Sequence, residues 1–156
     1  MPHRAARRAV AIVGLPAALW WLQPWKLLVR IAADESLPLG AQTTCCGEFT
    51  GHIHRTSGVA RLLTLGDGAQ VLRLENLRTT LGPRLHVWLS DTTVGHSRFP
   101  SRKFADSNHI DLGRLRANRG NTHYAVPNGA DTGALSSVIL WCERFSVSFG
   151  AAQLQP

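Results

Sequence analysis

The chain has 156 residues, of which 44% are apolar and 17% are charged, so it is long enough for one folded domain and too apolar for a disordered chain. Its formal net charge of +7 is concentrated at the N-terminus, because five Lys/Arg and no acidic residue occur in the first thirty residues. From Ala33 onward there are 12 Lys/Arg and 10 Asp/Glu. A net charge of +2 is too small to hold a phosphate backbone, and we therefore expect no nucleic acid partner.

Residues 1–31 have the pattern of a signal anchor. The run Ala9–Trp25 contains seventeen residues without a charge, follows an arginine cluster, and ends among Trp20, Trp21 and Trp25. This pattern predicts one N-terminal hydrophobic transmembrane helix, with the N-terminus cytoplasmic and the domain extracytoplasmic. A secretory signal cleaved near Ile31–Ala33, which would release a secreted domain, is the alternative.

The segment Ala32–Thr44 is polar and contains a proline and a glycine, which is typical of a linker. Residues 45–156 then form short β-like runs separated by turn residues, and they predict an all-β domain: an antiparallel β-sandwich or barrel-like module of about eight strands. Gly66–Gly68 has the composition of a hairpin turn. The expected strands are Glu48–His54, Val59–Leu65, Gln70–Leu74, Leu85–Ser90, Asp111–Leu115, Thr122–Val126, Val138–Cys142 and Phe145–Phe149.

The stretch Ser136–Gly150 reads SSVILWCERFSVSFG and has the pattern of a buried strand. Ile139 and Trp141 fall on one face of the predicted strand, and Val138, Leu140 and Cys142 fall on the other. Both faces are apolar, which predicts a strand between two layers. After Cys142 the pattern changes to one apolar face, so a bulge or bend is expected at residues 142–144.

Three cysteines permit at most one internal disulfide, and extracytoplasmic thiols tend to oxidise. Cys142 can be a buried thiol, the disulfide partner of Cys45 or Cys46, or a redox or ligand site. Hydrolase and phosphate-binding motifs are absent from the sequence, as are C-x-x-C-H and zinc-type spacings. No metal site is expected from the scattered histidines, which are His52, His54, His86, His96, His109 and His123.

Two blocks resemble the DM-thirteen domain family, an extracytoplasmic β module described as an electron-transfer domain. The first is Gly82–Ser90 (GPRLHVWLS), and the second is Ser136–Gly150. Shorter matches begin at Gly47-Glu48-Phe49 and end near Leu154. The chain is similar to a membrane-anchored, bacterial-type single-domain member of this family.

The resemblance implies that Cys142 acts in redox chemistry, either as a bare thiol or as the ligand of a prosthetic group such as non-covalent haem. It implies electron transfer or thiol redox as the function, with an envelope redox or protein partner. The vicinal pair Cys45-Cys46 departs from the family's simplest form. A non-catalytic envelope binding or structural module, with Cys142 in the core or in a disulfide, is the alternative function.

Overall fold

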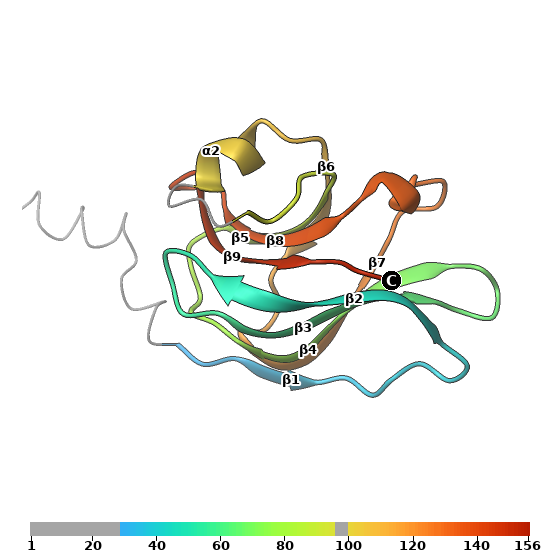
Figure 1. Ribbon diagram of the computed structural model, residues 1–156. Helices are drawn as coiled ribbons and strands as arrows, with labels where there is room; N and C mark the ends of the chain where they lie inside the picture. The colour runs from blue at the N-terminus through green and yellow to red at the C-terminus, as the bar shows by residue number, and fades with distance from the viewer. Residues whose placement is uncertain (1–28, 96–99) are drawn as a thin grey trace, which may run out of the picture.

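The computed structural model describes residues 29–95 and 100–156, and in this part the chain folds into one curled nine-stranded sheet (Figure 1). The predicted N-terminal helix lies outside the described residues. No helix within them has both the length and the apolar character needed to cross a membrane. The elements are β1 (Ala32–Asp34), β2 (Gln42–Gly51), β3 (Ser57–Thr64), β4 (Gln70–Arg78), β5 (Leu85–Ser90), α2 (Pro100–Ala105), β6 (His109–Arg114), β7 (Arg119–Ala125), η2 (Thr132–Ala134), β8 (Ser137–Cys142) and β9 (Val147–Gln153).

The strand order is β1-β7-β4-β3-β2-β9-β8-β5-β6, and β2 joins the two halves of the sheet. The first part of β2 pairs with β3, whereas its last three residues, Phe49–Gly51, pair with β9. The sheet curls at this strand, so that the half containing β3 and β4 faces the half containing β8 and β5 (Figure 1). The all-β prediction is confirmed. The sheet is mixed rather than antiparallel, because β1 runs parallel to β7.

The β3–β4 hairpin forms where the glycine-rich turn predicted it. Leu65 and Ala69 close the turn through a backbone hydrogen bond of 2.8 Å, and the side chain of Asp67 accepts the Ala69 N–H at 3.0 Å. Gly68 has φ of +83°, a conformation that glycine adopts without steric cost. Leu62 and Leu72 face each other across the hairpin and are buried.

The main core lies between the two halves of the sheet and contains the inward-facing residues of β3, β4, β5, β8 and β9. A second apolar cluster lies on the outer face of β5, β8 and β9, where α2 covers it (Figure 1). Its centre is Phe104 of α2, which is fully buried against this face. β8 is therefore buried on both faces, as its sequence predicts.

The structure corrects four boundaries drawn from the sequence. The bulge or bend predicted at residues 142–144 is a turn at residues 143–146, and β9 begins at Val147 rather than Phe145. β2 ends at Gly51, so His52 and His54 lie in the following loop rather than on a strand. The predicted loop Asp91–His109 contains the short helix α2. The segment 32–44 includes β1 and the first residues of β2.

β1 is held by specific contacts rather than by an apolar pattern. Asn118 accepts the Ile31 N–H through its side chain at 2.8 Å, and Glu35 donates its N–H to the Asn121 carbonyl at 3.0 Å. Gly120 pairs with Ala33 and has φ of +93°. A Cβ atom at this position would lie 1.9 Å from the Ala33 carbonyl oxygen, so only glycine permits this approach.

Candidate functional site

Trp141 and Cys142 are consecutive residues of β8 whose side chains lie on opposite faces of the sheet. β8 pairs with β5 on one side and β9 on the other, so its faces are covered by different clusters. Cys142 belongs to the main core, and Trp141 belongs to the cluster under α2. One peptide link therefore connects the interior of the fold to its outer aromatic face.

Cys142 is a fully buried thiol with an exposed fraction of 0%. It lies between Leu85 of β5 and Val147 of β9, and its Sγ donates to the Pro83 carbonyl oxygen at 3.2 Å. Burial raises the pKa of Cys142, although backbone N–H groups of the following turn and the Arg144 charge act in the opposite direction. Thiol–disulfide exchange needs an accessible thiolate, so this environment disfavours it.

Cys45 and Cys46 are free, half-buried thiols of β2. Cys45 packs against the main core, and burial raises its pKa, with a further contribution from neighbouring Cys46. Cys46 exchanges backbone hydrogen bonds with Gln155, whereas Cys142 pairs with Val147 at the other end of β9. Eight residues of extended chain separate these positions, which is roughly 25 Å. The fold thus does not bring Cys142 within the approximately 7 Å Cα separation that a disulfide needs.

A haem ligated by Cys142 does not fit the folded chain. Core side chains surround the thiol completely, and its Sγ is already engaged by Pro83. An open groove of about 700 Å³ occurs elsewhere, lined by His52 and His54 among others, and Cys142 is not part of its wall. Any electron that reaches Cys142 must therefore travel through protein.

Three rings form a stack that runs from the surface to β8. The exposed His109 lies over Trp88 with ring centroids 3.7 Å apart and an interplanar angle of 14°. Trp88 in turn stacks on Trp141 at 4.8 Å and 21°. Both indole rings are largely buried, at 7% and 4% exposure. Stacked aromatic rings thus connect the solvent to the residue that precedes Cys142.

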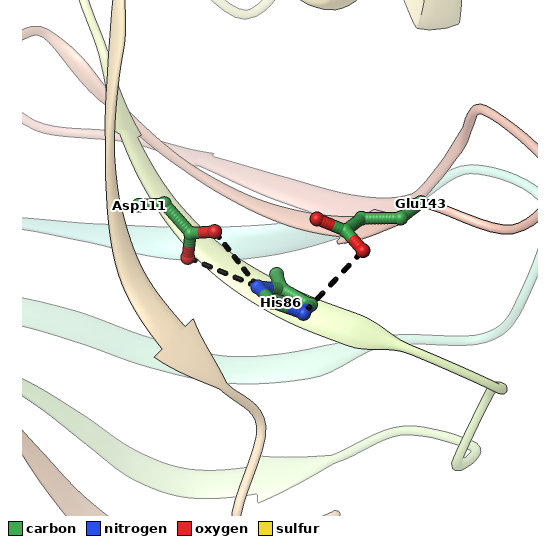
Figure 2. Close-up of side chains that lie close together, drawn as sticks. All are labelled: His86, Asp111 and Glu143. Atoms are coloured by element: carbon green, nitrogen blue, oxygen red, sulfur yellow. Dashed lines mark hydrogen bonds and ion pairs between the residues drawn. The ribbon is translucent and has the colours of Figure 1, made fainter.

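His86, Asp111 and Glu143 lie close together, as Figure 2 shows. Strand pairing places this cluster beside the stack, because His86 pairs with Trp141 and Asp111 pairs with Trp88. His86 is on β5 directly opposite Trp141, Asp111 is on β6, and Glu143 begins the turn after β8. His86 Nδ1 lies 2.8 Å and 3.1 Å from the two Asp111 carboxylate oxygens, and Nε2 lies 3.8 Å from Glu143 Oε2. No local pattern in the sequence indicates this cluster, because strand pairing brings together residues that are 25 or more positions apart.

The remaining histidines named from the sequence lie away from this cluster where the structure describes them, and His96 lies outside the described residues. His52 and His54 line the open groove, where burial lowers the pKa of each imidazole. His123 Nδ1 lies 2.9 Å from Glu35 Oε2, and its Nε2 lies 2.6 Å from Arg73 Nη1. Among the histidines that the structure describes, His86 is thus the one that the fold places between two carboxylates.

Comparison with known proteins agrees with the family resemblance of the two sequence blocks. No curated protein and no solved structure gives a significant match. A family model described as electron transfer DM13 matches residues 48–154, which include β2 from Glu48 through β9 and therefore Cys142 and the aromatic stack. Because this match covers most of the chain, the protein belongs to the electron transfer DM13 family.

Proposed function

We propose that this domain transfers single electrons in the cell envelope, with Cys142 as the redox group and the Trp88–Trp141 pair as its route to the surface. The observation that carries the proposal is the continuous stack from exposed His109 through Trp88 to Trp141, which is the residue bonded to Cys142. Membership of an electron-transfer family supports it. A buried thiol is better suited to electron transfer than to thiol exchange, because an electron can cross a layer of protein that a reacting molecule cannot.

The proposed step removes one electron from the Cys142 sulfur and breaks its S–H bond. The electron passes to a one-electron oxidant, a metalloprotein of the envelope that docks over His109. The proton leaves at the same time, because burial raises the pKa of this thiol and keeps it neutral. The Cys142 thiol donates to the Pro83 carbonyl oxygen at 3.2 Å, and we propose that the proton leaves along this hydrogen bond and passes to solvent.

The test is photo-oxidation of the protein by a ruthenium polypyridyl complex with a sacrificial acceptor, followed by electron paramagnetic resonance. The wild-type protein is expected to form a tryptophan radical that gives way to a sulfur-centred product. Cys142→Ala should stop at the tryptophan radical. Trp88→Phe should slow formation of the sulfur product, since the phenyl ring fills the space but is much harder to oxidise. Tyr124→Phe, a buried aromatic change in the main core, is the matched control. A sulfur product at an unchanged rate in Trp88→Phe would refute the route.

A structural module is the second candidate, and the complete burial of Cys142 favours it. In that case Cys142→Ala lowers the free energy of unfolding by about 1–2 kcal/mol through lost packing. Photo-oxidation of the wild-type protein then yields no sulfur-centred product. The stability loss is expected for either candidate, because Cys142 is buried in both, and the photo-oxidation product separates them.

We also propose that residues 1–31 anchor the domain, with the N-terminus in the cytoplasm and the domain outside. The uncharged run Ala9–Trp25, preceded by arginines, supports this proposal. An anchored protein stays in the membrane pellet after alkaline carbonate extraction, and a membrane-impermeant thiol reagent labels Cys46 in intact cells. N-terminal sequencing that begins near Ala33 would instead identify a cleaved signal.

A further inference from the structure

We propose that His86 and Glu143 bind a divalent first-row transition-metal ion, with Asp111 orienting the imidazole. The three side chains converge within 4.8 Å on the outer face of β5, β6 and the turn after β8 (Figure 2). This inference goes beyond the proposed function, because metal binding here does not require Cys142 to be redox active.

The contacts of Asp111 decide which ring nitrogen of His86 faces a metal. Both carboxylate oxygens lie within hydrogen-bond distance of Nδ1, and the Gly113 N–H donates to Oδ1 of Asp111 at 2.8 Å. The carboxylate is therefore held in place and favours the tautomer that carries the proton on Nδ1. The Nε2 lone pair is then available on the opposite side of the ring. Metal-binding histidines usually have a carboxylate or carbonyl in the position that Asp111 occupies.

The spacing between the two candidate ligand atoms also fits a metal. His86 Nε2 and Glu143 Oε2 are 3.8 Å apart, which is too long for a hydrogen bond. Two ligands about 2.1 Å from one tetrahedral ion are about 3.4 Å apart, so a closure of about 0.4 Å would suffice. The His86 side chain is 14% exposed and that of Glu143 is 32% exposed, so an ion can enter from solvent.

The donor types indicate the class of ion. Imidazole nitrogen suits zinc, copper, nickel and iron, and a carboxylate completes a mixed N/O set. Two protein ligands leave the remaining positions to water, so we expect a dissociation constant on the order of micromolar and copper(II) binding tighter than zinc.

Arg84 provides a distinctive test, because it competes with the ion. Its Nη2 lies 3.0 Å from the same Glu143 oxygen, and its side chain is mostly exposed. A cation bound at Oε2 must displace this guanidinium. Removal of the Arg84 charge should therefore strengthen metal binding, whereas in a simple salt-bridge network it would create no site.

His123 supplies a matched control within the same chain. It also contacts a carboxylate through Nδ1, that of Glu35, but its Nε2 faces Arg73 at 2.6 Å. A buried cation at Nε2 leaves no room for a metal ion. His123→Gln should leave metal binding unchanged.

The experiment is titration of the full chain, purified without a histidine tag, with Zn²⁺ by calorimetry and with Co²⁺ by visible absorption. Wild-type protein should bind one ion, with a Co²⁺ spectrum that lacks thiolate charge-transfer bands. His86→Gln and Glu143→Gln should weaken binding at least about tenfold, and Asp111→Asn about 10–100-fold. Arg84→Gln should tighten it several-fold.

Absence of binding by the wild-type protein would overturn the proposal, as would unchanged affinity in His86→Gln. Thiolate bands in the Co²⁺ spectrum would assign the ion to Cys45 and Cys46 instead. If His86→Gln fails to fold, Arg84→Gln and Asp111→Asn test the site in its place, because an unchanged metal affinity in both variants refutes it. Loss of radical transfer to Cys142 with intact metal binding would affect only the proposed function.

Discussion

Substitution of Gly120 by alanine tests how β1 is attached to the sheet. Gly120 has φ of +93°, and an added Cβ would lie 1.9 Å from the Ala33 carbonyl oxygen. Backbone atoms on both sides cannot absorb this overlap, so β1 must move away from β7. Gly68→Ala is the matched control, because Gly68 has φ of +83° but nothing lies within 4 Å of its added Cβ.

Gly68→Ala and Gly120→Ala both place alanine in the left-handed backbone region, but only Gly120→Ala also disrupts the pairing of β1 with β7. Alanine in the left-handed region costs about 1–2 kcal/mol, and Gly68→Ala should lose about this amount. Gly120→Ala additionally loses the three residue pairs between β1 and β7 and the Ile31–Asn118 hydrogen bond. Each hydrogen bond contributes about 0.5–1.5 kcal/mol net, and the freed residues regain backbone entropy. We expect Gly120→Ala to lose about 2–4 kcal/mol in total.

Urea unfolding followed by tryptophan fluorescence measures both losses. Hydrogen exchange of a peptide covering residues 30–36 measures β1 directly, and exchange should rise strongly in Gly120→Ala and remain at the wild-type rate in Gly68→Ala. Equal stability losses with unchanged exchange in this peptide would refute the account of β1 given above.

Three further outcomes are expected. Burial lowers the pKa of His52 and His54 below the ordinary value of 6.5, so the unfolded chain binds protons before the folded chain does as the pH falls. The free energy of unfolding should therefore be full above about pH 6.5 and decline toward pH 5. Urea unfolding of a double His→Gln variant tests this, and a pH dependence equal to that of the wild type would contradict it. Glu75→Gln should lower the free energy of unfolding by about 2 kcal/mol, because Glu75 is the counter-ion of the buried Arg73 at 2.8 Å; a loss below about 0.5 kcal/mol would show that the pair is not important. A thiol reagent should modify Cys142 only after unfolding, and rapid modification of the native protein would contradict its burial.

Local patterns predicted much of the sheet. β8 was identified with both faces apolar because Val138, Leu140 and Cys142 alternate with Ile139 and Trp141, and each set is buried in a separate cluster. The β3–β4 hairpin followed from its glycine-rich turn. These features depend on neighbours in sequence, which is why the sequence alone reveals them.

The features that the sequence did not reveal depend on distant residues. β1 has three residues and no apolar pattern, and it forms because β7 and Asn118 provide its partners. The sequence predicts a bulge or bend at residues 142–144, but the extent of the turn, residues 143–146, is set by the pairing of β8 with β9, and Ser146 adopts φ of +50° within it. The histidine cluster requires the β5–β6 pairing, and no local spacing of His86 indicates it.

The edge position of β1 has a mechanical consequence. The described chain enters the sheet through this strand, which three residue pairs with β7 and contacts of Ile31 and Glu35 hold at the edge. If residues 1–28 are held at a membrane, a pull on the domain loads this edge strand before it reaches β2 and β9. Release of residues 29–41 adds roughly 45 Å of chain, since an extended residue spans about 3.4 Å. Under force β1 would then detach first and lengthen the tether, while the core, Cys142 and the aromatic stack stay folded.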